Sequence, residues 1–390
     1  MIKGADLSSL LEVEACGGRF YERSKPCHSE RSEASFSDVS SQAPQNDKAE
    51  SEDALVILKR HGVNLIRLRL WNDPYDENGS PYGAGTNDLA RTIEMARRCR
   101  TLGLAWLLDF HYSDFWADPG KQYPPKAWQG LDEDGLVQAV YDFTLQTLQK
   151  LKALDLLPDM VAPGNELSNG LLWPVARVPH YDAIARIVSA AIRAIREIDP
   201  AIPVMLHLDN GGSNELYRRW FDNYLQNGGA DFDCIGLSYY PFWHGSMDDL
   251  RRNMNDIALR YGKPLIIAET STAFTLDECN RHEGLERTEK RGLAANEKTA
   301  AAVPYPMTPA GQCQFLQDLA AVIRQVPNRL GRGLIWWEPA WLPVKGSHWA
   351  TDAALRYIHE AGPGGNEWAN QALFDYDGAA LPALELMSVL

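Results

Sequence analysis

An alternation of short apolar segments with longer segments of helical periodicity constrains the fold of this chain more than any other feature of its sequence. The apolar segments have the length of buried strands, and helical patterns follow most of them. The predicted strands cover residues 2–6, 63–70, 104–110, 158–165, 202–208, 233–239, 264–269 and 333–338. The predicted helices cover residues 86–102, 133–154, 179–197, 213–227, 246–261 and 309–326. This alternation is typical of βαβ units and therefore predicts a parallel sheet.

Eight strand–helix repeats in 390 residues predict an α/β fold with one (β/α)₈ barrel, a TIM barrel, as a single domain over residues 1–390. A doubly wound open sheet is the alternative arrangement of such repeats. That fold usually carries a glycine-rich phosphate-binding turn after its first strand, and no predicted strand of this chain is followed by one. The barrel is therefore the favoured prediction.

Two polar stretches interrupt the repeats. Residues 24–50 are rich in serine and poor in large apolar side chains, so we expect a disordered insertion there. The insertion separates residues 7–22 from 51–62, where the first helix is expected, and its segment "CHSERSEAS" resembles a translated dispersed genomic repeat. A regulatory or docking loop is the alternative. Residues 277–303 predict a long loop after the seventh strand, and another long loop is expected after the eighth.

The charge and composition restrict the classes of partner. A net charge of −14 disfavours nucleic acids and anionic membranes, and it suits a neutral substrate. Twelve Trp and fifteen Tyr side chains supply flat faces that bind sugar rings, although such residues also fill cores. No apolar run has the length of a transmembrane helix. The first residues, MIKGADLSSL, have no features of a signal peptide, so we expect either a cytoplasmic protein or a natural start further upstream.

Polar and aromatic residues gather at the carboxyl ends of the predicted strands, where barrel enzymes carry their reacting groups. The segments are 67–74, 109–116, 165–166, 207–210, 238–241, 268–271 and 336–341. Glu166 ends the fourth strand and Glu269 ends the seventh, across the barrel mouth from each other. Retaining glycoside hydrolysis needs two carboxyl groups on opposite sides of the scissile bond, about 5 Å apart. Each glutamate alone is equally explained by a salt bridge or a loop cap, but the two together predict a catalytic pair.

Eight segments, in chain order, resemble the arabinogalactan endo-β-1,4-galactanases of glycoside hydrolase family 53, a barrel superfamily with catalytic glutamates on strands four and seven. They are KGADLSSL, IRLRLWNDP, LLDFHYSDFWADPGKQ, GNELSNGLLWP, MLHLDNGG, IGLSYYPFWHG, ETSTAFTL and WWEPAWLP, followed by WANQALFDYDG near the end of the last motif. The resemblance covers nearly all of the chain except 24–50 and much of 277–303.

The resemblance implies a retaining endo-β-1,4-galactanase that cuts the galactan side chains of type I arabinogalactan or pectin. It implies that Glu166 is the acid/base and Glu269 the nucleophile, in a double displacement that requires no cofactor. It also suggests a secreted protein, and we expect a monomer. Some members of the family hold calcium between the loops after strands seven and eight. The matching candidates are Glu278, Asn280 and His282, but Gly284 stands where another side-chain ligand is expected, and calcium needs six to eight oxygens.

Further residues at the strand ends are candidates for substrate binding. Asn165 can bond the sugar 2-hydroxyl in the transition state. A cation beside the nucleophile would keep it ionised; Arg69 is the candidate, and Arg67 on the same strand face is the alternative. The remaining candidates are Trp71, Asp109, His111, Asp114, Trp116, Tyr240, Trp337 and Trp341. Core packing, structural ion pairs or bracing of other side chains would explain each of them as well.

Two other functions remain open from the sequence. A different endo-β-glycanase, such as a mannanase or a glucanase, could use the same barrel and the same two glutamates. A sugar-binding protein without activity is the second alternative, because the insertion at 24–50 interrupts the first helix and could damage the fold. The presence of both glutamates argues against an inactive site.

Overall fold

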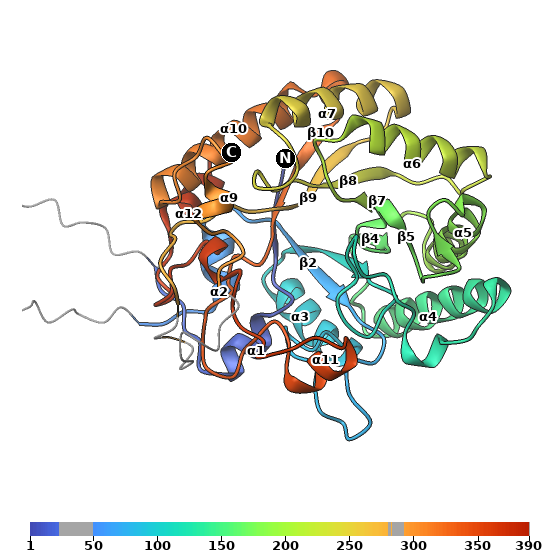
Figure 1. Ribbon diagram of the computed structural model, residues 1–390, viewed down its shortest axis with the longest axis horizontal. Coiled ribbons are helices and arrows are strands. Elements are labelled where there is room, and N and C mark those ends of the chain that lie inside the picture. Colours follow the sequence, from blue (N-terminus) through green and yellow to red (C-terminus); the bar gives the residue numbers. More distant parts are fainter. Residues whose placement is uncertain (23–49, 280–281, 283–291, 390) are drawn as a thin grey trace, which may run out of the picture.

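The computed structural model describes residues 1–22, 50–279, 282 and 292–389, and eight parallel strands form its centre (Figure 1). In chain order the strands are β1 (Ile2–Asp6), β2 (Leu65–Leu70), β3 (Ala105–Phe110), β4 (Met160–Pro163), β7 (Met205–Leu208), β8 (Cys234–Ser238), β9 (Leu265–Thr270) and β10 (Gly331–Trp336). All eight match predicted strands. The fourth and seventh predicted strands are therefore β4 and β9.

The pairing of the strands follows the order of the chain around a ring. Each strand except β4 pairs with the next one along the chain, and the last strand, β10, pairs with β1, with Ile2 opposite Gly333. The bridge between Val161 and Val204 joins β4 to the start of β7 and nearly closes the sheet. A doubly wound sheet would pair its first strand with a middle strand, so the barrel prediction is confirmed.

Helices form the outer layer of the molecule (Figure 1). They are α1 (Leu10–Ala15), α2 (Ala54–Arg60), α3 (Leu89–Thr101), α4 (Glu133–Ala153), α5 (Tyr181–Ile198), α6 (Asn214–Gln226), α7 (Met247–Tyr261), α9 (Glu297–Ala300), α10 (Pro309–Gln325), α11 (Asp352–Tyr357) and α12 (Pro382–Met387). The ends of α7 illustrate how the sequence sets such boundaries. Ser246 and Asp249 form a capping box at its start, and Gly262 ends it with a left-handed φ of 64°.

The barrel interior has an apolar layer below a polar one. The apolar layer consists of Leu65, Leu107, Ala162, Met205, Cys234, Ile266, Ala268 and Ile335. Gly4 belongs to the same level, because a Cβ there would lie 2.7 Å from Cγ1 of Ile335. Nearer the carboxyl ends of the strands, the buried side chains are charged or polar, among them Arg67, Asp109 and His207. Since burying an unpaired charge is costly, this upper layer has to be paired internally.

Several short elements were not predicted. They are the two-stranded hairpin of β5 (Gly170–Leu171) and β6 (Ala176–Arg177), the helix α9 within the predicted loop 277–303, the helices α11 and α12, and the 3₁₀ turns η1 (Lys126–Trp128), η2 (Leu167–Asn169), η4 (Pro327–Arg329) and η5 (Ala369–Gln371). The predicted disordered insertion lies outside the described residues except for its last position, so it stays a prediction. Among the described helices, none has the length and apolar character needed to cross a membrane.

Candidate active site

A cavity of about 370 Å³ opens at the carboxyl ends of the strands. It is lined by Arg67, Arg69, His111, Trp116, Ala117, Asp118, Pro119, Lys121, Asn165, Glu166, Asp209, Tyr240, Trp243, His244, Glu269, Trp337, Trp349, Glu360 and Trp368. Both predicted catalytic glutamates are among these residues. The cavity therefore brings together side chains from the ends of most barrel strands, as expected for a barrel enzyme.

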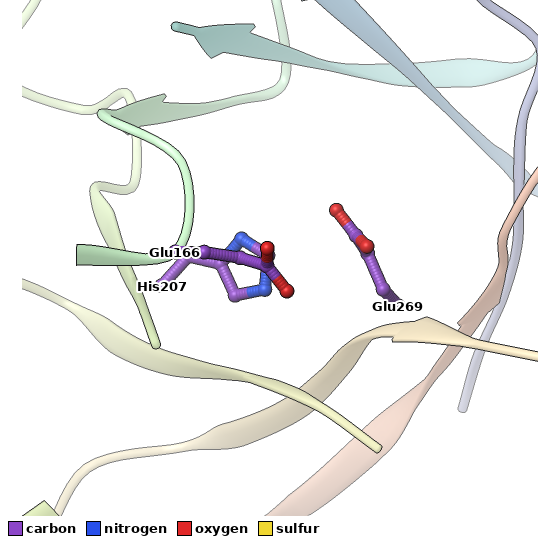
Figure 2. Close-up of side chains that lie close together, drawn as sticks. All are labelled: Glu166, His207 and Glu269. Carbon is purple, nitrogen blue, oxygen red and sulfur yellow. The ribbon is translucent and has the colours of Figure 1, made fainter. Parts of the chain in front are cut away.

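Glu166 and Glu269 face each other across this cavity (Figure 2). One carboxylate oxygen of each lies within 4.8 Å of the other, and a ring nitrogen of His207 lies within the same distance of both. Glu269 is part of β9, whereas Glu166 follows β4 with a left-handed backbone, φ 50° and ψ 57°. Such a conformation is unfavourable for a residue other than glycine and is often found at functional sites.

Glu269 has a cation and a hydroxyl as its partners. Nη2 of Arg67 lies 2.8 Å from Oε1, and the hydroxyl of Tyr240 donates to Oε2 at 3.0 Å. Burial raises the pKa of Glu269, and the charge of Arg67 opposes that effect. The pKa of Glu269 stays raised overall, but Arg67 and Tyr240 both stabilise its ionised carboxylate, which is the form required of a nucleophile.

Arg67 is the central cation of the polar layer. Its guanidinium donates to Asp6 at 2.6 Å and to Asp109 at 2.7 Å. Burial disfavours the charged guanidinium, but the nearby carboxylates outweigh it and raise the pKa of Arg67. Burial strongly opposes the ionisation of Asp109, yet the charge of Arg67 and the hydrogen bond from His111 together lower the pKa of that carboxyl to about 2. Arg67 is therefore permanently charged and stabilises the ionised carboxylate of Asp109.

Glu166 has a neutral partner instead. The hydroxyl of Ser238 lies 2.6 Å from its Oε1. Burial is the main cause that raises the pKa of Glu166 well above its usual range, and the charges of Glu269 and Asp209 add to it. When two neighbouring carboxyl groups have environments that separate their pKa values, the one with the higher pKa is suited to donate a proton. This environment is compatible with the predicted role of Glu166 as the acid of the pair.

The structure places Arg67, rather than Arg69, next to the nucleophile. Arg69 lies one inward-facing position further along β2, where its Nη1 donates to Glu338 at 2.6 Å and its guanidinium packs 4.2 Å from the ring centre of Trp116. Burial raises the pKa of Glu338 to about 7, although Arg69 opposes this effect. Arg69 still lines the cavity, so it remains a candidate for substrate binding.

The structure divides the predicted substrate-binding residues into two groups. Those that line the cavity are Arg69, His111, Trp116, Asn165, Tyr240 and Trp337. Trp71, Asp109, Asp114 and Trp341 are buried and are not among the cavity-lining residues. Asp114 accepts hydrogen bonds from the backbone N–H groups of Asp73 and Lys126, and Trp341 donates to Asn366 at 2.6 Å. These side chains support the loops behind the cavity wall.

Several cavity-lining residues were missed by the sequence analysis. Trp349 belongs to the long segment after β10 and lies too far from the strand end for a strand-end pattern to indicate it, whereas Trp368 begins the quoted segment WANQALFDYDG and could have been included. Trp243 and His244 follow β8 within the quoted segment IGLSYYPFWHG, so they could have been included. Asp209, which belongs to the strand-end segment 207–210 but was not named as a candidate, also lines the cavity.

The predicted calcium site is only partly described, because Asn280 lies outside the described residues. The imidazole Nδ1 of His282 lies 3.7 Å from a carboxylate oxygen of Asp377, and its ring contacts Tyr376. Imidazole is a ligand for transition metals more than for calcium, so His282 fits the predicted site poorly. The calcium site stays a prediction.

Glu166, His207 and Glu269 form a second group that could hold a metal ion by its residue types. Both ring nitrogens of His207 already have hydrogen-bond partners, which leaves no lone pair free for a metal.

The sequence model of the family described as Glycosyl hydrolase family 53 matches residues 2–387. The chain belongs to this family. It is 34% identical over 403 residues to the endo-beta-1,4-galactanase of Bacillus subtilis (strain 168), covering 99% of this chain and 85% of that one. It is 30% identical over 391 residues to the arabinogalactan endo-beta-1,4-galactanase of Humicola insolens, covering 98% of each.

A solved structure of the same family has the same fold. The family 53 catalytic domain of Ignisphaera aggregans matches with a TM-score of 0.83 and 36% identity, covering 99% of this chain and 95% of that one. The resemblance stated from the sequence motifs is thereby confirmed. The chain is a glycoside hydrolase, and its family 53 barrel carries the two glutamates at the ends of β4 and β9.

Proposed function

We propose that this family 53 enzyme is a retaining endo-β-1,4-galactanase that hydrolyses the β-1,4-galactan of type I arabinogalactan and pectin side chains. The observation that supports this most is the pair of carboxylates within 4.8 Å, one beside Arg67 and the other beside Ser238. Retaining glycosidases have their carboxyl groups about 5–5.5 Å apart, whereas inverting ones need about 6.5–9.5 Å to admit a water. The names of the Bacillus and Humicola relatives support the choice of substrate.

In the first step, Glu269 attacks the anomeric carbon while the bond from that carbon to the glycosidic oxygen breaks. Glu166 transfers its proton to this leaving oxygen, and a glycosyl ester forms on Glu269. Asn165 accepts from Arg67 through Oδ1 and donates one amide hydrogen to the carbonyl of Ala117. Its second amide hydrogen can bond the sugar 2-hydroxyl, a contact that strengthens as positive charge develops on the ring.

In the second step, Glu166 acts as a base. It removes a proton from a water that attacks the anomeric carbon, and the ester bond to Glu269 breaks. Two inversions leave the product with the β configuration of the substrate. Arg67 and Tyr240 remain in place to stabilise the carboxylate of Glu269 as it is released.

The cavity wall suits a neutral polysaccharide. Five tryptophans line it, namely Trp116, Trp243, Trp337, Trp349 and Trp368, and they supply flat apolar faces for sugar rings. The net charge of −14 offers no attraction to polyanions, which is compatible with an uncharged galactan. Because these aromatic side chains are spread around the rim of the cavity, they are compatible with binding of the polysaccharide in the middle of its chain.

The test is incubation with linear β-1,4-galactan, with products separated by chromatography over time and their anomeric configuration followed by NMR. Mixed oligosaccharides that appear early with the β configuration would support the proposal. Early α products would contradict retention, and monosaccharide alone would contradict endo cleavage. Mannan, xylan and β-glucan serve as parallel substrates, and activity on one of these without activity on galactan would contradict the substrate.

A further inference from the structure

A buried row of hydrogen-bonded side chains connects Asn165 to Glu166 by a path that runs behind the cavity. Asn165 Oδ1 lies 3.0 Å from Nδ1 of His207, whose Nε2 lies 2.8 Å from the hydroxyl of Ser238. The same hydroxyl lies 2.6 Å from Oε1 of Glu166. His207 and Ser238, the two inner members of the row, have no exposed surface, so they exchange no hydrogen bonds with solvent.

The direction of the row is set by the amide of Asn165. The guanidinium of Arg67 can only donate, so the atom that faces it at 2.7 Å is the amide oxygen. The carbonyl of Ala117 can only accept, so the atom that faces it at 2.8 Å is the amide nitrogen. The two contacts together exclude the flipped amide.

The amide oxygen in turn decides which nitrogen of His207 carries a hydrogen. An oxygen that only accepts requires a donor opposite it, so Nδ1 is protonated. A second proton on the ring is disfavoured, because burial, with the charge of Arg67, lowers the pKa of His207 to about 3. Nε2 therefore presents a lone pair to Ser238.

Ser238 has a single hydrogen and two neighbours that compete for it. If that hydrogen is donated to Nε2 of His207, the oxygen of Ser238 presents only lone pairs to Glu166. The contact between the two oxygens is then favourable only if Glu166 brings a hydrogen of its own.

We propose that His207 and Ser238 are positioning residues that hold Glu166 in its protonated, acid form before the glycosidic bond is cleaved. This inference rests on the proposed function, in which Glu166 is the acid/base. When Glu166 has given its proton to the leaving oxygen, the hydroxyl of Ser238 rotates and donates to the new carboxylate. It turns back to His207 when Glu166 regains a proton from the attacking water. Ser238 keeps its own hydrogen throughout, so the proton count of the reaction is unchanged.

Other titratable groups also act on Glu166 from the elements around it. They are Glu269 on β9, Asp209 after β7, Asp118 after β3, Tyr240 after β8 and Tyr217 on α6. The carboxylates favour the protonated form as well, so a single variant cannot separate their effect from that of the row. The effect of the row can be separated by comparing the same change at His207 with and without Ser238, because the carboxylates stay constant in that comparison.

The test is the pH dependence of kcat/KM on galactan for the wild type, His207→Phe, Ser238→Ala and the double variant. The alkaline limb of this profile reports the pKa of the essential acid in the free enzyme. In His207→Phe the hydroxyl of Ser238 is released to donate to the Glu166 carboxylate, so we expect the limb to move down by about one pH unit. In the Ser238→Ala background the same change at His207 should leave the limb where it is.

A limb that does not move in His207→Phe, or that moves equally in both backgrounds, would overturn the proposal. A wild type without activity on galactan would instead refute the proposed function. Should the His207 variant fail to fold, ¹⁵N NMR of the imidazole in the wild-type enzyme gives a second test. Between pH 5 and 8 we expect a neutral ring protonated at Nδ1, and a ring protonated at Nε2 or at both nitrogens would overturn the inference.

Discussion

At the scale of single residues, Glu166 and Glu269 differ in the charge of their nearest neighbours. Glu269 lies 2.8 Å from the guanidinium of Arg67, whereas Glu166 has the hydroxyl of Ser238 at 2.6 Å. Both side chains are buried in the same cavity, so the difference comes from their neighbours and not from their exposure. One group is therefore prepared to attack, and the other is prepared to donate a proton.

We predict that Glu269→Ala abolishes turnover of galactan while binding of the oligosaccharide persists. Without the nucleophile no glycosyl ester forms, so the rate should fall by more than about 10⁴-fold. Steady-state assays and calorimetric titration with a galacto-oligosaccharide measure the two effects. Glu215→Ala, at a highly exposed glutamate of α6, is the control and should retain full activity. Turnover that survives in Glu269→Ala would refute the assignment of the nucleophile.

The alkaline limb of activity should depend on Glu166. Because burial raises its pKa well above the usual range, Glu166 stays protonated at a pH where an exposed glutamate is ionised, and activity is lost as the pH rises through the raised pKa. We predict that Glu166→Gln is slow on galactan and lacks this limb. On an aryl galactoside with a good leaving group, which needs no proton, formation of the ester should be far less affected. An unchanged limb in Glu166→Gln would assign the acid to another residue.

A third prediction concerns the stability that Arg67 provides. Arg67→Met leaves Asp6, Asp109 and Glu269 without their shared cation, so we expect a loss of about 3–5 kcal/mol at neutral pH. Arg67 lowers the folded-state pKa of Asp109 to about 2, so its contribution is present above the unfolded pKa and is lost as the pH falls towards 2. The difference between variant and wild type should therefore shrink in acid.

Denaturant unfolding at several pH values measures this difference. Arg60→Met is the matched control, because Arg60 also pairs with two carboxylates, those of Glu22 and Glu52, but at the surface. Surface ion pairs contribute little, so this control should lose far less stability. Equal losses in the two variants would contradict the central role of Arg67.

The placement of Glu166 and Glu269 at the cavity could be predicted from the sequence because each ends a strand that is recognisable from its apolar run. The choice between Arg67 and Arg69 could not, because both alternate onto the same face of β2 and only the tertiary structure decides which carboxylate each one meets. Likewise, Trp71 and Trp341 look like sugar platforms in the sequence, but packing buries them behind the cavity wall.

Among the elements, the small hairpin of β5 and β6 follows directly after Glu166 and η2. Gly170 has a φ of 85°, and a Cβ there would lie 1.9 Å from the carbonyl oxygen of Ala176. We predict that Gly170→Ala costs more than roughly 3 kcal/mol and lowers kcat, because the turn that presents Glu166 must shift. Thermal unfolding and activity assays measure both effects.

Gly103 provides the control for this prediction. It also has a positive φ, 65°, but a Cβ there would meet nothing within 4 Å. Gly103→Ala should therefore cost only the backbone strain, about 1–2 kcal/mol, and should leave kcat unchanged. If both variants behave alike, the contact with Ala176 is not what constrains the hairpin.

The barrel strands and the long helices were predictable because each is long enough to show a period. Strands of two residues, such as β5 and β6, are too short for an alternating pattern, and the six-residue helices α11 and α12 form less than two turns. These elements exist because tertiary contacts stabilise them. The same reasoning explains why Trp349, in the irregular segment after β10, was not recognised.

For the whole molecule, we predict that the stretch 24–49 is dispensable. The residues on either side of it are held together, because the N–H of Glu52 donates to the carbonyl of Phe20 at 2.9 Å and Tyr21 pairs with Ala379. A short Gly-Ser linker in its place should keep kcat/KM within about twofold, since closing a shorter loop costs less entropy. Activity assays and a thermal melt measure the result. A folded variant without activity would favour the regulatory or docking alternative.

Because the strands form a nearly closed ring, the same barrel could form from a chain that begins at a different strand. β1 lies beside β10, and the ammonium of Lys3 donates to the backbone carbonyl of Ser388 at 3.2 Å. A few residues could link these two regions, and the chain could be reopened between Phe20 and Glu52, which pair with each other. Such a circular permutant would present the same walls to the substrate, although its first strand would be β2.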